Sequence, residues 1–143
     1  MDIRRLASLA LASTLAVSLC VAGAGPTAAA RPTRSASLEA TFIVKDGRCY
    51  LTETASWTGY QVNRIRFLGY VEGHSGMDYG LFDTQGYPKG ESHASGSMTS
   101  TAFAAARPGE GWYGYALLRT NGGGRLAEVW SPVVYAPAEC LYP

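Results

Sequence analysis

Apolar and polar side chains alternate along much of the chain after residue 36, and this pattern limits the fold more than any other feature. Every second side chain is apolar or small in residues 38–45, and the pattern returns in residues 49–57, 65–71 and 113–118. A period of two is typical of a β-strand that is covered on one face and solvated on the other. Glu53 is an exception, because it falls on the apolar side of its segment. We therefore expect an all-β domain.

Turn residues separate these segments. Asp46-Gly47 is a strong signal for a two-residue hairpin, and Asn121-Gly122-Gly123-Gly124 predicts a second hairpin. Thr58-Gly59 predicts a turn, and residues 84–96 predict a long surface connection because they are rich in Gly, Ser and charge.

The later segments complete the set of expected strands. Residues 98–106 contain alanines that favour helix, but their threonines and Phe103 favour a strand, which we predict. Residues 126–135 predict the last strand, at an edge or a bulge, because Pro132 lacks a backbone donor. About seven short strands with regular turns predict a two-layer antiparallel β-sandwich, residues 37–143. A small closed β-barrel is the alternative.

The first thirty residues have the pattern of a secretory signal peptide. Arg4 and Arg5 precede an uncharged, mostly apolar run over residues 6–24, and three alanines precede Arg31. We expect cleavage there, a flexible stub over residues 31–36, and an extracellular protein. The alternatives are a membrane anchor, twin-arginine export and a lipid anchor at Cys20.

Charge and cysteines limit the partners of the mature part. Residues 31–143 hold ten Lys and Arg and ten Asp and Glu, with the arginines scattered along the sequence. A neutral domain lacks the electrostatic signature of a nucleic-acid or anionic-membrane binder. Cys49 and Cys140 are the two remaining cysteines. In an oxidising compartment they predict one disulfide, because no other His or Cys lies near them in sequence to make a metal site.

Two segments give the chain a resemblance to known proteins. Thr52-Glu53-Thr54-Ala55-Ser56-Trp57-Thr58-Gly59-Tyr60 resembles the second strand of an immunoglobulin-like or fibronectin-like domain, and Trp112-Tyr113-Gly114-Tyr115-Ala116-Leu117-Leu118-Arg119 resembles the sixth. The leader and layout are similar to those of small secreted proteins of actinobacteria. The resemblance implies an immunoglobulin-like sandwich and no particular function. True immunoglobulin domains link their second and sixth strands, whereas Cys140 lies beyond the last expected strand.

Glu53 is the most informative of the ionisable residues. A buried carboxylate must be paired or neutral. It could pair with Arg64, Arg66 or Arg119, or form a catalytic pair with Glu128. It could also lie at an exposed or bulged position.

Other candidate catalytic and metal-binding residues fit their patterns poorly. Ser75 lies in Gly73-His74-Ser75-Gly76, but Met77 stands where a nucleophile elbow needs glycine. His74 and His93, with nearby carboxylates, match no metal-ligand spacing. The nearby carboxylates are those of Asp78, Asp83 and Glu91. We predict no metal and no cofactor.

Tyrosines are the best functional signal in the sequence. Tyr and Trp concentrate at recognition surfaces because they give a large contact area at low entropy cost. The tyrosines that exceed the needs of a small core are Tyr60, Tyr70, Tyr79, Tyr87, Tyr113, Tyr115 and Tyr135. All except Tyr135 form our candidate binding surface, and the loops at 72–78 and 84–96 are a second candidate contact surface.

We predict a secreted, non-enzymatic binding domain. The first hypothesis is contact with an extracellular protein, such as an enzyme that the domain inhibits, through loops and exposed aromatics. The second is a carbohydrate or cell-wall module with a flat tyrosine strip, and the third is a small hydrolase. A planar row of aromatics on one sheet face would favour sugar, whereas a protruding loop cluster would favour protein.

Overall fold

The computed structural model describes residues 30–74 and 81–141, without the side chains of residues 81 and 82. The chain divides into residues 1–30 and 31–143, and the fold is that of the second part. Its strands are β1 (Ser35–Lys45), β2 (Arg48–Val62), β3 (Arg64–Val71), β4 (Leu81–Gly86), β5 (His93–Phe103), β6 (Gly111–Arg119), β7 (Arg125–Trp130) and β8 (Val134–Tyr135).

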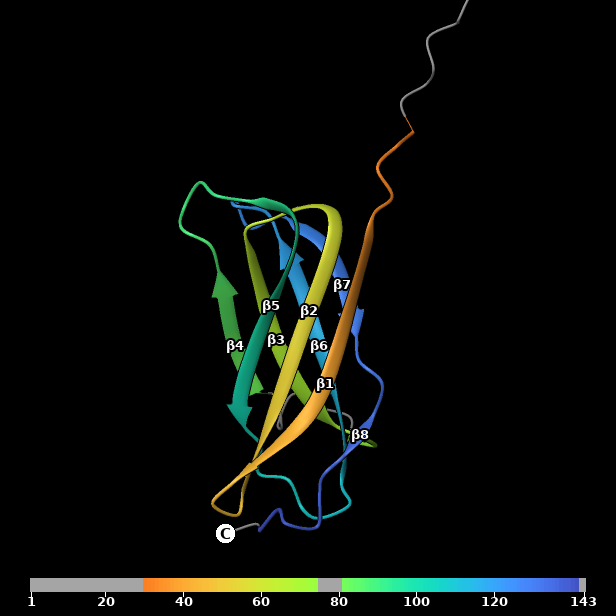
Figure 1. Ribbon diagram of the computed structural model, residues 1–143, viewed down its shortest axis with the longest axis vertical. Helices are drawn as coiled ribbons and strands as arrows, with labels where there is room; N and C mark the ends of the chain where they lie inside the picture. Colours follow the sequence, from red (N-terminus) through yellow and green to blue (C-terminus); the bar gives the residue numbers. More distant parts are fainter. Residues whose placement is uncertain (1–29, 75–80, 142–143) are drawn as a thin grey trace, which may run out of the picture. The chain divides into compact units, whose positions relative to one another are not determined.

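Two antiparallel sheets pack face to face, as predicted. The first sheet has the order β1-β2-β5, and the second has the order β4-β3-β6-β7, with β8 paired to β6 below β7. Figure 1 shows β1, β2 and β5 crossing over β3 and β6. The described residues contain no helix, and the sheets do not close into a barrel. None of those residues forms a helix long and apolar enough to cross a membrane.

The strand boundaries differ from the expected ones in several places. β1 begins at Ser35, inside the expected stub of residues 31–36, and β5 ends at Phe103 instead of residue 106. The 84–96 segment is not one long connection, because its ends belong to β4 and β5 and only residues 87–92 connect them. Thr58-Gly59 does not end a strand but forms part of an irregularity inside β2. Pro132 splits the expected last strand into β7 and β8, which raises the number of strands to eight.

The hairpin between β1 and β2 confirms the turn prediction. Asp46 and Gly47 both have positive φ, of 52° and 71°. These are the values of a type I′ turn, in which Asp is tolerated and Gly is favoured. Lys45 pairs with Arg48 across this two-residue loop.

The core between the sheets has two clusters of apolar side chains. The first includes Trp57, Phe67 and Leu118, and the second includes Leu51 and Trp112. Ala55 and Trp57 of β2 and Ile65 and Phe67 of β3 are alternate residues in the first cluster, since successive side chains point to opposite faces of a sheet.

The disulfide closes the end of the sandwich that holds the second cluster. Cys49 of β2 and Cys140 are bonded, with a Cα–Cα distance of 5.4 Å, and both are buried. The backbone N–H of Leu141 donates to the carbonyl of Gly47 at 2.9 Å, which fixes the end of the chain to the β1–β2 hairpin. The predicted disulfide is therefore present.

Asn63 is the single residue between β2 of the first sheet and β3 of the second. It is 1% exposed, and its Nδ2 donates to the carbonyls of Glu91 at 2.6 Å and Pro88 at 3.2 Å. Its own backbone carbonyl accepts from the N–H of Tyr87 at 2.8 Å. Asn63 thus holds the β4–β5 connection against the corner of the sandwich.

Replacement of Asn63 with Ala is expected to lower the free energy of unfolding by about 2–3 kcal/mol. The variant loses several hydrogen bonds at a buried site and leaves carbonyl groups without a donor. Chemical denaturation measures the effect. The exposed neighbour Gln61, replaced with Ala, serves as the matched control and should change stability by less than about 0.5 kcal/mol. Equal stability of the two variants would contradict a supporting role for Asn63.

Candidate binding face

Four aromatic side chains gather on the outer face of the second sheet. Tyr70 of β3 and Tyr113 of β6 are direct cross-strand partners whose rings stack at 5.6 Å and 21°. Trp130 of β7 lies 5.8 Å from the Tyr113 ring, 6.0 Å from that of Tyr70 and 4.5 Å from that of Tyr115. We call these four residues the aromatic face.

The aromatic face is open to solvent, chiefly at Trp130. The Trp130 side chain is 56% exposed, while the three tyrosines are half-buried against one another and against it. Clustered aromatic rings on a sheet stabilise it through cross-strand contacts. A Trp more than half exposed within such a cluster also leaves a large apolar surface available to a ligand.

Polar groups border the aromatic face on β7. The Tyr115 hydroxyl donates to Glu128 at 2.7 Å, and Arg125 forms an ion pair with the same carboxylate oxygen at 2.9 Å. Partial burial, together with this hydrogen bond to a carboxylate, raises the pKa of Tyr115 to about 12. The phenol therefore stays protonated and can donate this hydrogen bond to Glu128.

The structure brings together only three of the six tyrosines in the predicted surface. Tyr70, Tyr113 and Tyr115 lie in the aromatic face, whereas Tyr60 and Tyr87 pack against the first core cluster. Tyr60 lies under the guanidinium of Arg34 at 5.8 Å. Tyr87 stacks on His93 at 3.9 Å and contacts Trp57. Tyr79 lies outside the described residues.

Trp130 is the member of the face that the sequence prediction missed. Glu128 and Trp130 alternate with Ala127 and Val129, which is the same period-two pattern used elsewhere. Applied to this segment, the pattern would have placed Trp130 on an outer face.

The outer face of the first sheet carries cross-strand pairs of hydroxyl groups. Thr52 and Thr101 share a hydrogen bond at 3.0 Å, and Thr54 and Thr99 share one at 2.9 Å. These cross-strand pairs satisfy one another and make the face polar and wet.

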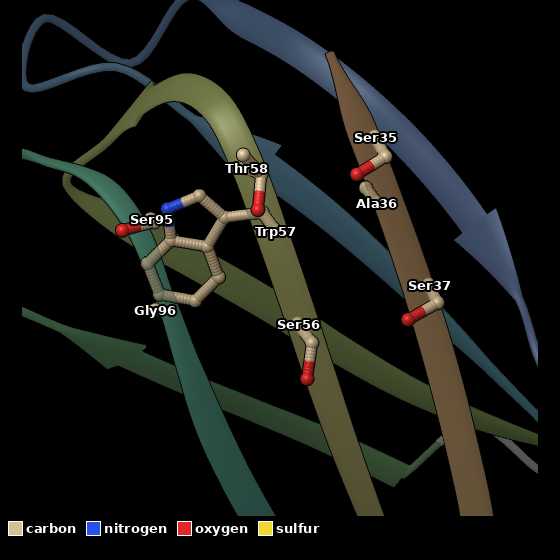
Figure 2. Close-up of a pocket in the computed structure, with 8 residues that line it drawn as sticks. All are labelled: Ser35, Ala36, Ser37, Ser56, Trp57, Thr58, Ser95 and Gly96. Atoms are coloured by element: carbon tan, nitrogen blue, oxygen red, sulfur yellow. The ribbon is translucent and has the colours of Figure 1, made fainter. Parts of the chain in front are cut away.

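An open depression of about 360 Å³ lies at one end of this sheet. Its lining residues are Ser35, Ala36, Ser37, Ser56, Trp57, Thr58, Ser95 and Gly96. Figure 2 shows the Ser37 and Ser56 hydroxyls on neighbouring strands, and the Trp57 ring extending toward β5. Among the residues that the structure describes, no ionisable side chain lines this depression, so its lining offers hydrogen bonds but no acid–base chemistry.

Glu53 is buried between the sheets. It is 3% exposed, and its carboxyl lies over Gly114, where any side chain would collide with Oε1. The facing Ser100 donates its hydroxyl to Asp83 at 2.6 Å, and Oε1 of Glu53 has no hydrogen-bond partner among the described residues. Burial raises its pKa to about 8, against a backbone hydrogen bond from Tyr115 that lowers it, and the nearby charge of Asp83 adds to the rise.

This placement corrects the alternatives for Glu53. The exposed position is wrong, because the side chain is among the most buried polar groups described. Pairing with Arg64, Arg66 or Arg119 is also wrong. These arginines occupy outward-facing positions of β3 and β6, whereas Glu53 lies between the sheets. Glu128 is likewise on the outer face, so the two carboxyls are not a catalytic pair.

The remaining candidates form no centre in the described part of the chain. No group of three or more His, Cys, Asp and Glu that could hold a metal occurs there. His93 stacks on Tyr87, and Asp83 accepts from Ser100 and Gln85. Ser75 and Asp78, like Cys20 and the leader, lie outside the described residues.

Similarity to proteins of known function would be independent evidence about what this surface binds. Comparison of the chain with family models, with curated proteins and with solved structures finds no match. The arrangement of the side chains on the second sheet therefore carries the functional inference.

Proposed function

We propose that the chain is a secreted, non-enzymatic binding domain that holds a carbohydrate chain on its aromatic face. The observation that carries this proposal is the gathering of four rings on one sheet face, with Trp130 56% exposed. Aromatic rings give flat apolar surface at low entropy cost, on which the C–H faces of sugar rings can pack. The Glu128 carboxylate at the border supplies an acceptor for sugar hydroxyls.

The position of the aromatics favours carbohydrate over our first hypothesis of an extracellular protein. That hypothesis needs exposed aromatics in protruding loops. Tyr87, in the β4–β5 connection, instead packs on His93 and Trp57. Among the described residues, the cluster of four rings lies on a sheet, which is a rigid platform for an extended ligand.

The immunoglobulin-like character and the secretion belong to the same proposal. In the immunoglobulin fold the first, second and fifth strands share a sheet, and the third, sixth and seventh share the other. The orders β1-β2-β5 and β3-β6-β7 agree with this, and β4 joins the second sheet. The pattern of residues 1–30 and the disulfide support an extracellular location.

Replacement of Trp130 with Ala is expected to weaken polysaccharide binding at least tenfold. The side chain contacts three tyrosines and is the most exposed ring of the aromatic face, as a binding hot spot requires. Affinity electrophoresis of the purified protein through gels that contain neutral or acidic polysaccharides measures the loss.

Phe103 offers a matched control for this experiment. It is also an exposed aromatic, but it lies on the outer face of the first sheet beside Tyr50. Phe103→Ala should migrate as the unmodified protein does. If no polysaccharide retards the unmodified protein, or if Trp130→Ala is retarded equally, the proposed function is wrong.

A further inference from the structure

Arginines that are far apart in the sequence gather on the same outer face as the aromatic rings. Arg64 of β3 lies directly opposite Arg119 of β6, which pairs in turn with Arg125 of β7. We call these three residues the arginine row. Arg66 lies next to the row on β3, between it and the aromatic face.

The charges of this row are mostly uncompensated. Like charges directly across two strands destabilise a sheet, so three neighbouring guanidinium groups are costly for the fold alone. Arg125 is balanced by Glu128. Arg64 and Arg119 form no ion pair with any residue in the described ranges, and Nε of Arg119 is buried there without a hydrogen-bond partner. The row therefore has positive charge and donors that no described side chain uses.

The geometry makes one continuous surface of the arginine row and the aromatic face. Arg64 and Tyr70 are outward residues of the same strand, and six residues of a strand span about 20 Å. Tyr115 and Trp130 are cross-strand partners in one row between these two ends, next to the row of Tyr70 and Tyr113. An extended ligand along β3 and β6 would contact charge at one end and rings at the other.

We propose that this surface is a site for a polysaccharide of uronic-acid residues, an inference that rests on the proposed carbohydrate function. A guanidinium donates two parallel hydrogen bonds to a carboxylate, which makes Arg the preferred partner of planar acids. A uronic acid carries that carboxylate on a sugar ring with an apolar face for the aromatic rings. A phosphate-linked chain of small alcohols would satisfy the arginines but leave the rings uncovered.

The distribution of charge also argues against a nucleic acid. Nucleic-acid binding draws most of its affinity from many phosphate contacts, which a strongly basic domain supplies. Here the basic groups are concentrated at one end of the surface, and residues 31–143 hold equal numbers of acidic and basic side chains.

Polygalacturonate and its methyl ester provide the sharpest test. The ester keeps the sugar chain but removes the carboxylate charge. Titration calorimetry should show binding of polygalacturonate at least tenfold tighter than of the ester. The double variant Arg64→Gln, Arg119→Gln should lose this preference, and Arg48→Gln, on the first sheet, should retain it.

Thermal unfolding separates loss of the site from loss of the fold. Because the double variant removes a like-charge contact, its unfolding midpoint should be unchanged or raised. A preference for polygalacturonate that survives in this variant would overturn the inference.

Comparison of the ligands also distinguishes failure of this inference from failure of the proposed function. Equal binding of polygalacturonate and its ester overturns the uronic-acid inference but leaves carbohydrate binding in place. Absence of binding to any polysaccharide overturns both. Binding of single-stranded DNA as tight as that of polygalacturonate would indicate attraction to charge alone and would also overturn the inference.

Discussion

Reduction of the Cys49–Cys140 disulfide is expected to lower the free energy of unfolding by about 4–5 kcal/mol. The bond joins residues with a sequence separation of 91, and so it restricts most of the unfolded domain. Small domains are stable by roughly 5–15 kcal/mol. The loss should therefore bring the reduced protein close to unfolding on mild warming.

Urea unfolding of the oxidised protein and of the protein kept reduced measures this difference directly. The double variant Cys49→Ala, Cys140→Ala is the companion measurement, because it removes the cross-link and the buried sulfur atoms together. It should be as unstable as the reduced protein or slightly less stable. A change below about 1 kcal/mol on reduction, or two free thiols in the oxidised protein, would contradict the expected result.

The disulfide and the hairpins illustrate what a sequence can predict. Asp46-Gly47 specifies its turn through local backbone preferences, and alternation specifies which side chains of β2 face the core. Two cysteines allow only one pairing. Each of these inferences depends on neighbouring residues or on a count, and each is confirmed.

The candidate site needed information that a single sequence does not contain. Arg64, Arg119 and Arg125 look scattered until the register of β3, β6 and β7 places them side by side. Register between strands far apart in the chain depends on packing of the whole core. The predicted surface accordingly contained Tyr70 and Tyr113 without showing that they stack.

Glu53 shows that contacts in the core were also not predictable from the sequence alone. Its break in the alternation was visible in the sequence, but an exposed end, a bulge and a paired carboxylate were all consistent with it. The structure shows a regular strand in which Glu53 pairs with Ala40 on one side and Ser100 on the other. Gly114 on the opposite sheet makes room for it, and that contact between β2 and β6 has no local signature in the sequence.

The buried carboxyl is expected to make the protein less stable as pH rises from about 4.5 to about 8. Burial raises the pKa of Glu53 to about 8 in the folded protein, whereas the unfolded chain has the ordinary value of 4.5. Between these two values the folded state keeps a proton that the unfolded state has lost. The free energy of unfolding therefore falls with rising pH across this window.

The same two pKa values set the pH limits of this effect and the size of the fall in the free energy of unfolding. Below pH 4.5 both states are protonated, and above pH 8 both are ionised, so Glu53 adds no slope in either range. The gap between the two pKa values corresponds to a fall of about 5 kcal/mol. Asp83 does not contribute to it, because hydrogen bonds from Ser100 and Gln85 lower the pKa of that carboxyl below its ordinary 3.8 and keep it ionised throughout.

Replacement of Glu53 with Gln should remove this pH dependence, because the amide has a similar shape and does not ionise. Urea unfolding at several pH values between 4.5 and 8.5 should give a nearly flat profile for Glu53→Gln and a falling one for the unmodified protein. Any cost of burying the amide is the same at every pH. It therefore changes the free energy of unfolding by a constant amount and leaves its slope with pH unchanged. Glu39→Gln, an exposed substitution on the adjacent strand β1, should leave the slope unchanged. Parallel profiles for the unmodified protein and Glu53→Gln would mean that the carboxyl reaches water when it ionises, and that the two sheets separate at this point far more easily than their packing implies.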